Sequence, residues 1–239
     1  MIEIDNLVKS FGKTKALDGI SLRIGDSEIY GFVGANGAGK TTTMRIISGL
    51  IPADSGKVTI NGLDSVKNIR QIKSKIGYVP DYFGVYDNLR VTEYMEFFAA
   101  AYDLTGREVE KRCLRLLDEL GLVDKPEFFV DDLSRGQKQR LALARAILHD
   151  TPVYIFDEAT SNIDVESEEM IMKVIYQLSL VKTVILISHR LANVVSSDNI
   201  YVLHNGRVEQ SGTHTELMMK SKLYNNLVEK TKLAEEFVY

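Results

Sequence analysis

The chain has little of what would place it outside a cell or inside a membrane. Its single cysteine, Cys113, excludes an internal disulfide, and the apolar residues around it at helical spacing predict a buried thiol. No apolar run reaches the roughly 18 residues of a membrane span, so any membrane role would need a partner chain. Met1 leads into the alternating residues Ile2–Asp5 without a basic or apolar leader, so the cytoplasm is the expected location.

The chain also has no excess of positive charge, with 29 Lys and Arg residues against 33 Asp and Glu residues. The formal net charge is −4, and no basic patch stands out, so a broad nucleic-acid surface is not expected. What is present is an ordinary globular composition, with 45% hydrophobic and 26% charged residues among 239. That length accommodates one large α/β domain or two small ones, and composition does not choose between them.

The most informative stretch is the glycine-rich segment Gly34–Thr42. It fits the pattern G-x-x-x-x-G-K-[ST] and carries an additional glycine at Gly37. Glycines let the backbone turn so tightly that its N–H groups point at phosphate oxygens. Lys40 would add a mobile positive charge, and Thr41 a hydroxyl for Mg²⁺. Because an apolar strand pattern at 28–33 precedes the segment and a helical one follows, it predicts a nucleoside triphosphate site.

Two continuous apolar runs end in polar residues. Val153–Phe156 is followed by Asp157 and Glu158, and the run at 183–187 leads to His189. Such runs are typical of strands covered on both faces in a parallel sheet, where ligands bind at the carboxyl ends. We therefore expect Asp157 to hold Mg²⁺ and Glu158 to orient or deprotonate an attacking water, with His189 in the same crevice.

The remaining periodicity predicts how these motifs are held. Alternation within 2–4 and 20–24 is typical of half-buried antiparallel strands, so a small β-layer is expected at the start. A helical stripe between the two apolar runs completes a β-α-β unit, and the phosphate loop supplies another, which predicts a right-handed, mostly parallel core sheet. His204–Arg207 carries the signal of a two-residue hairpin.

From about Leu89 to Leu148 the apolar residues fall at helical spacing, which predicts a helical subdomain. Its first helix is expected to bury Tyr94, Phe97, Phe98 and Ala101. Residues 105–108 fit a capping box for its second helix. Ser134 and Gln137 fit S-x-x-Q, so Ser134 is expected to cap a further helix whose free N–H groups form a second anion site.

In these motifs and in their order, the sequence resembles the ATP-binding cassette family of transporter ATPases over nearly the whole chain. Gly34–Thr42 resembles the family's Walker A loop, Val153–Glu158 its Walker B strand and Leu133–Gln137 its signature motif. Ser161–Asp164 resembles the D-loop, and His189 the switch histidine. The site residues that this resemblance implies are Phe11, Gly34, Asn36, Gly37, Gly39, Lys40, Thr41 and Thr42 for ATP; Glu158 and His189 for catalysis; Thr41, Asp157 and Asp81 for the metal; Ser134, Gly136 and Gln137 for the ATP of a partner chain; and Asp164 in the D-loop.

The resemblance implies an α/β P-loop NTPase fold with a mostly parallel core sheet, an N-terminal antiparallel β-layer and an inserted helical subdomain. One domain would cover 1–239, with the nucleotide-binding core at 1–88 and 150–239 and the helical subdomain at 89–149. Two such domains, identical or paired, would pack head to tail with Mg²⁺ and ATP between Walker A and the partner's signature motif. A separate transmembrane permease subunit would hold them at the inner face of the cell membrane.

The sequence departs from the family pattern at two positions. Arg135 replaces the first glycine of the usual signature pair, and Asp81 stands where the family usually has a glutamine that contacts Mg²⁺ and the water. A carboxylate is shorter than glutamine, cannot donate a hydrogen bond when ionised and adds negative charge near ATP. We therefore expect Asp81→Gln to raise the rate of hydrolysis.

Other interpretations stay open. The stretch up to about Asp150 resembles subunits that serve separate membrane chains, whereas Asp157–Glu216 resembles domains fused to exporter segments, so a recombined or designed mosaic is one hypothesis. Asp81 and such a mosaic together suggest an ATP-dependent dimerisation module that barely hydrolyses ATP. A further hypothesis is a soluble ATP-switched clamp that acts on nucleic acid or ribosomes. The sequence has no long coiled-coil insertion, second cassette or basic patch that would support it.

Overall fold

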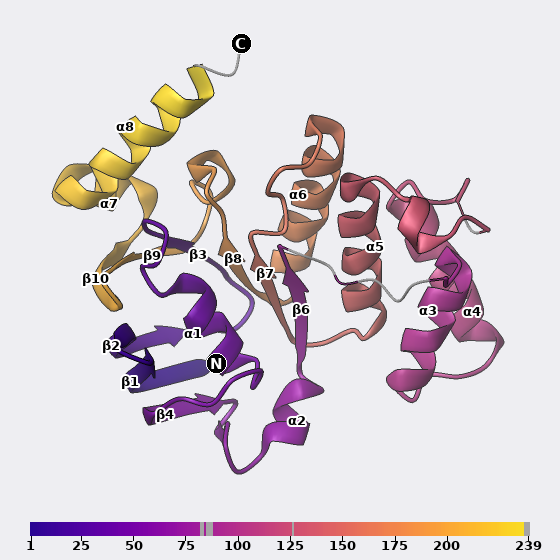
Figure 1. Cartoon of the computed structure of the whole chain (residues 1–239), viewed down its shortest axis with the longest axis horizontal. Helices are drawn as coiled ribbons and strands as arrows, with labels where there is room; N and C mark the ends of the chain where they lie inside the picture. Colours follow the sequence, from indigo (N-terminus) through magenta and orange to yellow (C-terminus); the bar gives the residue numbers. More distant parts are fainter. Residues whose placement is uncertain (82–83, 85–87, 126, 237–239) are drawn as a thin grey trace.

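The computed structural model describes residues 1–81, 84, 88–125 and 127–236, with side chains up to residue 231. Its strands form two sheets, one of four strands in the order β2-β1-β4-β5 and one of six in the order β10-β9-β3-β8-β7-β6 (Figure 1). The strands are β1 (Ile2–Phe11), β2 (Thr14–Ile24), β3 (Ile29–Val33), β4 (Ser55–Ile60), β5 (Leu63–Asp64), β6 (Ile76–Pro80), β7 (Val153–Asp157), β8 (Thr183–Ile187), β9 (Asn199–His204) and β10 (Arg207–Gly212). The predicted α/β class is confirmed.

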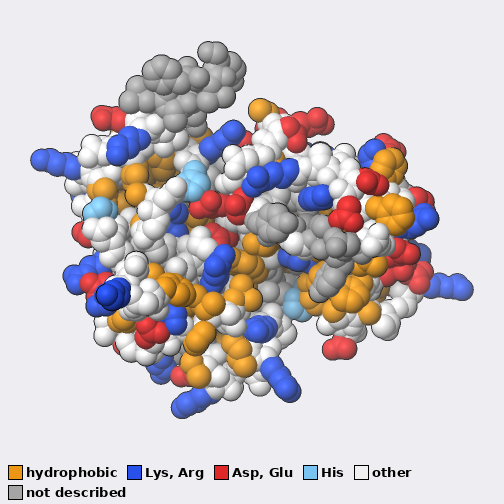
Figure 2. All heavy atoms as spheres, viewed as in Figure 1, with side chains coloured by type: hydrophobic (Ala, Val, Ile, Leu, Met, Phe, Trp, Pro, Cys, Tyr) orange, Lys and Arg blue, Asp and Glu red, His pale blue; other side chains and the backbone are white. Residues whose placement is uncertain are grey.

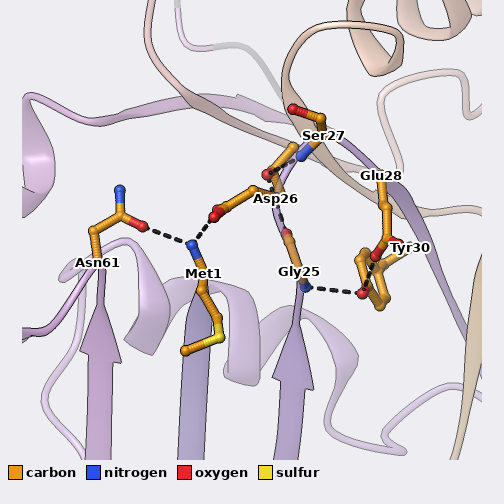
Figure 3. Close-up of polar contacts among 8 residues, drawn as sticks. Met1, Gly25, Asp26, Ser27, Glu28, Tyr30 and Asn61 are labelled. Carbon is orange, nitrogen blue, oxygen red and sulfur yellow. Dashed lines mark hydrogen bonds and ion pairs between the residues drawn. The ribbon is translucent and has the colours of Figure 1, made fainter.

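The smaller sheet is the predicted antiparallel layer. β1 pairs with β2 so that Ile2 lies opposite Ile24, and the apolar side chains that alternate along both strands point into one core. Its edge is joined to the larger sheet by polar contacts near the N-terminus (Figure 3). The Met1 amine donates to Asp26 and Asn61, and the Tyr30 hydroxyl of β3 accepts from the Gly25 N–H at 2.8 Å.

The larger sheet carries the candidate site because its central strands run parallel. β3, β6, β7, β8 and β9 share one direction, and only β10, at the edge, is antiparallel to its neighbour. The register places Pro80 beside Asp157 and Asp157 beside Ile187, so the carboxyl ends of β6, β7 and β8 meet at one edge. Side chains of β7 and β8 are buried on both faces, as the continuous apolar runs predicted.

Helices cover both faces of this sheet. The α-helices of the described chain are α1 (Lys40–Ile47), α2 (Ile69–Lys73), α3 (Val91–Ala101), α4 (Arg107–Glu119), α5 (Arg135–Leu148), α6 (Val165–Ser179), α7 (His214–Lys220) and α8 (Lys222–Glu236). α1 packs between the two sheets, α5 and α6 pack on the opposite face, and α3 and α4 lie beyond α5 at one end of the molecule (Figure 1). The boundaries of the helical subdomain at 89 and 149 stay a prediction. In the part of the chain that the structure describes, no helix is long and apolar enough to cross a membrane.

Two local predictions in the helical part are wrong. α3 buries Tyr94 as expected, but its inner face continues through Met95 and Ala99, while Phe97 is 46% exposed and Ala101 points outward. The buried face of α3 therefore runs through Val91, Tyr94, Met95 and Ala99. Phe98 lies at its border, where it is partly buried against the core and has the Arg145 guanidinium 5.2 Å from its ring centre.

The capping box at 105–108 does not form. α4 begins at Arg107, and its cap is Gly106 in a left-handed conformation with φ of 99°. Since Thr105 then lies one position too early to reach the N–H of the third helical residue, no side chain caps α4 in the described structure. Gly121 does end α4 in a left-handed conformation, and the Leu122 N–H donates to the Leu117 carbonyl across it.

Candidate functional site

The phosphate loop joins β3 to α1. Gly34, Gly37 and Gly39 all adopt positive φ, and a Cβ on Gly34 would lie 2.3 Å from the Leu203 carbonyl oxygen, so no larger residue fits there. Gly39 caps α1 without a side-chain hydrogen bond among the described residues. The first N–H groups of α1 lack acceptors within the helix, which leaves them available to an anion.

Lys40 reaches back over this loop. Its side chain is buried, and Nζ donates to the carbonyls of Gly34 at 2.7 Å and Ala35 at 3.2 Å. Burial lowers the pKa of Lys40, while the negative charges of Glu158 and Asp157 oppose that change. The Lys40 ammonium therefore lies within the phosphate loop, where a bound phosphate would need a positive charge beside it.

Asp157 occupies the buried end of β7 and is held from two sides. Thr41 Oγ1 donates to its Oδ1 at 2.8 Å, and the Tyr78 hydroxyl donates to its Oδ2 at 2.7 Å. Burial, followed by the charge of Asp157, raises the pKa of Tyr78, so this hydroxyl stays a donor. A carboxylate and a hydroxyl in contact are hard oxygen ligands that fit Mg²⁺. Sequence reasoning missed Tyr78, whose only signal was its place two residues before the end of β6.

Glu158 and His189 meet at the same edge. His189 Nε2 lies 2.7 Å from Glu158 Oε1, and the Glu158 side chain is 21% exposed. The Glu158 backbone has φ of 58°, an unfavourable left-handed conformation for a glutamate, and its N–H donates to the Ile187 carbonyl at 3.0 Å. The ends of β7 and β8 thus bring Glu158 and His189 into contact, and their roles in catalysis stay a prediction.

Phe11 lies at the end of β1, in the hairpin of β1 and β2 that packs against the phosphate loop. The following strand contacts the loop, since a Cβ on Gly39 would lie 2.9 Å from the Ala16 carbonyl oxygen. The Phe11 ring is 52% exposed and the Lys9 ammonium lies over it, 5.5 Å from the ring centre, so the stacking of Phe11 on a base stays a prediction. Asn36 is exposed on the loop, and Thr42 lies in the first turn of α1.

Ser134 caps α5 as the S-x-x-Q pattern predicts. The Gln137 N–H donates to Ser134 Oγ at 3.2 Å, and the Ser134 N–H donates to Gln137 Oε1 at 2.9 Å. Gly136 packs against the start of α6, where a Cβ would lie 2.3 Å from Ser167 Oγ. Asp164 caps α6 by accepting the Ser167 N–H at 2.8 Å. No described hydrogen bond or ion pair joins these residues to the phosphate loop of the same chain.

The two departures from the family pattern contact each other. Arg135 Nη2 lies 2.8 Å from Asp81 Oδ1, and both side chains are about half exposed. Gln139 Nε2 donates to the backbone carbonyls of Pro80 and Asp81, at 3.0 and 2.6 Å. Asp81 thus points toward α5, where Arg135 balances its negative charge. The repulsion between Asp81 and ATP that the sequence suggested is therefore reduced. Its role as a metal ligand stays a prediction.

The chain is similar to known ATP-binding proteins over most of its length. The family model described as ABC transporter matches residues 17–161. The linearmycin resistance ATP-binding protein LnrL of Bacillus subtilis is 35% identical over 91% of this chain and 70% of its own length. An uncharacterized ABC transporter ATP-binding protein of Haemophilus influenzae is 38% identical over 98% of this chain, which spans only 43% of that relative. A dimeric ATP-binding cassette in a post-hydrolysis state with ADP and Pi, 28% identical, superposes with a TM-score of 0.82 over 90% of this chain and 99% of its own.

Proposed function

Because this chain belongs to the ABC transporter family, we propose that it is the ATP-binding and ATP-hydrolysing subunit of a transporter. The observation that carries this function is the meeting of two pairs at one sheet edge. Thr41 contacts Asp157, and His189 contacts Glu158, beside a glycine loop that contains Lys40. Family membership favours this function over a soluble clamp on nucleic acid.

In the proposed site, the loop N–H groups and Lys40 hold the β- and γ-phosphates of ATP, while Phe11 stacks on adenine. Thr41 and Asp157 are the chain's ligands for Mg²⁺, which when bound neutralises charge that develops on the phosphates. Glu158 accepts a proton from the attacking water, or orients that water, with its oxygen positioned by His189. The Tyr78 hydroxyl fixes the second oxygen of Asp157 and so orients the carboxylate.

The signature residues require a second chain in this proposal. Ser134 and Gly136 lie at the N-terminus of α5, a place suited to an anion, yet no described contact joins them to their own loop. A head-to-tail dimer would bring this helix end to the ATP of the partner, and the dimeric state of the similar cassette described above supports a pairing of two chains. ATP would close the dimer, and hydrolysis would release it.

A transmembrane partner would convert this cycle into transport and would place the chain at the inner membrane face. Large apolar side chains are exposed over α1, β4 and α2 and again over α3 (Figure 2), among them Leu50, Val66 and Phe97. Exposed apolar areas mark interaction surfaces, which supports a partner subunit.

Mixing two inactive variants tests the shared site. Lys40→Ala removes the loop cation, and Ser134→Arg blocks the signature end of α5. In a mixed head-to-tail dimer, one site combines the changed phosphate loop of one chain with the changed α5 end of the other, and the second site is intact. Phosphate release should therefore recover in the mixture, although each variant alone is inactive. The same total concentration of either single variant is the control. No recovery, under conditions where gel filtration shows mixed dimers, would contradict the shared site.

The pairing of Asp81 with Arg135 gives a smaller, separate prediction. Arg135→Gln should slow hydrolysis by about fivefold or less, most visibly at low Mg²⁺, because an exposed ion pair contributes about 0.2–1 kcal/mol and its loss leaves Asp81 unbalanced. Asp81→Gln in that background should restore the rate. Steady-state phosphate release by the parent, both single variants and the double variant measures this, and strictly additive effects would show that the two residues do not compensate.

A further inference from the structure

Glu168 is a buried carboxylate that the proposed function does not use. It lies in the first turn of α6 and is 6% exposed, in a helix whose neighbouring residue Glu169 faces solvent. Burying a carboxylate without partners is strongly unfavourable, so a charge in this place needs compensation from nearby donors. The N-terminal end of α6 supplies a part of it through the helix dipole.

The specific partners of Glu168 both come from the segment that carries His189. Arg190, the next residue along the chain, forms an ion pair with Glu168 Oε2. Asn193 Nδ2 donates to Glu168 Oε1 at 2.8 Å. The two carboxylate oxygens therefore hold the segment 188–193 at two points, at the residue before its short 3₁₀ turn (Leu191–Asn193) and at the last residue of that turn.

The same network reaches the segment after Glu158. Asn193 Nδ2 also lies 3.3 Å from Thr160 Oγ1, two residues beyond Glu158. The Arg190 N–H donates to Ser188 Oγ at 3.1 Å, which fixes the backbone on both sides of His189. The His189 ring itself is 43% exposed, and among the described contacts its polar partner is Glu158, so its position depends on the segment that carries it.

We propose that Glu168 is a positioning residue that holds His189 against Glu158, through Arg190 and Asn193. This inference rests on the proposed function, because it concerns the same ATP site. Loss of the Glu168 charge would leave Arg190 and Asn193 without their common acceptor. The segment 188–193 would keep the hydrogen bond from the Tyr176 hydroxyl of α6 to the Asn193 carbonyl, but its end nearest His189 would be released. Glu158 Oε1 would lose its neighbour at 2.7 Å, while the loop that binds ATP would be unchanged.

Glu168→Gln tests this with Glu169→Gln as the matched control. Glutamine keeps the size of glutamate but has only one acceptor oxygen, and its other terminal group is an NH₂ donor. Because Arg190 and Asn193 both donate to Glu168, one of these two contacts is lost in Glu168→Gln. The expected result is a kcat lowered by about tenfold or more with KM for ATP unchanged, since small misplacements of catalytic groups cost up to about 10²-fold. Glu169→Gln should behave as the parent.

A double-variant cycle separates positioning from a general structural role. If Glu168 acts through His189, Glu168→Gln combined with His189→Ala should hydrolyse ATP no more slowly than His189→Ala alone. In the ATP-free chain, the imidazole resonance that His189→Ala removes should shift in Glu168→Gln and not in Glu169→Gln. Should Glu168→Gln fail to fold by circular dichroism, Arg190→Gln, changed at a half-exposed side chain, should give the same kinetics and the same shift.

Parental kinetics in Glu168→Gln, or effects that add to those of His189→Ala, would overturn the inference. That outcome differs from a failure of the proposed function. If the parent releases phosphate and Lys40→Ala does not, the ATPase assignment holds and only the role of Glu168 is lost. If the parent and Lys40→Ala release phosphate equally, the ATPase assignment itself is wrong.

Discussion

Glu158→Gln is expected to bind ATP like the parent and to hydrolyse it about 10²–10⁴-fold more slowly, the usual cost of losing a general base. The amide keeps the shape of the side chain, which lies 2.7 Å from His189 Nε2. It loses the basicity that accepts or orients a proton of the attacking water. Because hydrolysis is proposed to release the dimer, dimers should accumulate when ATP is added.

Single-turnover phosphate release and analytical ultracentrifugation measure these two effects. Glu166→Gln, at an exposed position further along the chain, serves as the control and should match the parent. Should Glu158→Gln turn over at the parental rate, the base lies elsewhere, and His189 is the next residue to change.

Lys40→Ala is expected to remove tight ATP binding, with the affinity lowered by about two orders of magnitude. Each hydrogen bond to a charged group contributes about 1.5–3 kcal/mol, and the buried Lys40 ammonium donates to the backbone carbonyls of Gly34 and Ala35, beside the place proposed for the phosphates. Binding of a fluorescent ATP analogue measures the change.

Lys111→Ala is the matched control for that variant, because Lys111 is exposed on α4 and pairs only with Glu108 among the contacts described. A thermal unfolding curve shows whether Lys40→Ala keeps the fold. A folded Lys40→Ala chain with parental affinity would mean that the loop Gly34–Thr42 does not hold the triphosphate.

The parts of the site that sequence predicted are those encoded in local patterns. The phosphate loop needs three glycines with positive φ and a lysine at fixed spacing, and each requirement is visible within nine residues. Strands β7 and β8 are apolar without interruption because both faces are covered, so their ends, and with them Asp157, Glu158 and His189, were also predictable.

The parts that sequence missed depend on contacts between distant segments. Tyr78 reaches Asp157 across 79 positions, and Arg135 reaches Asp81 across 54, distances along the chain over which no periodicity constrains a pair. Glu168 looks like any other helix glutamate in an acidic stretch, and only the fold reveals that it is buried against the segment of His189. Side-chain direction at such positions follows from tertiary packing, not from local propensity.

The failed capping box has a similar cause at a shorter range. Thr105–Glu108 satisfies the pattern, yet Gly106 adopts a left-handed conformation and starts α4 one residue later, so the Thr105 hydroxyl has no N–H within reach. Ser134–Gln137 carries the same kind of pattern without an intervening positive φ, and there both hydrogen bonds of the box form.

The most direct test of the ATPase assignment is phosphate release from Mg·ATP by the purified chain, measured over a range of chain concentrations alongside Lys40→Ala. If the chain hydrolyses ATP in sites shared between two copies, the rate per chain should rise with concentration and then level off as dimers fill, and Lys40→Ala should stay at the blank at every concentration. Phosphate release that never exceeds that of Lys40→Ala, at any concentration of chain or Mg·ATP, would contradict it.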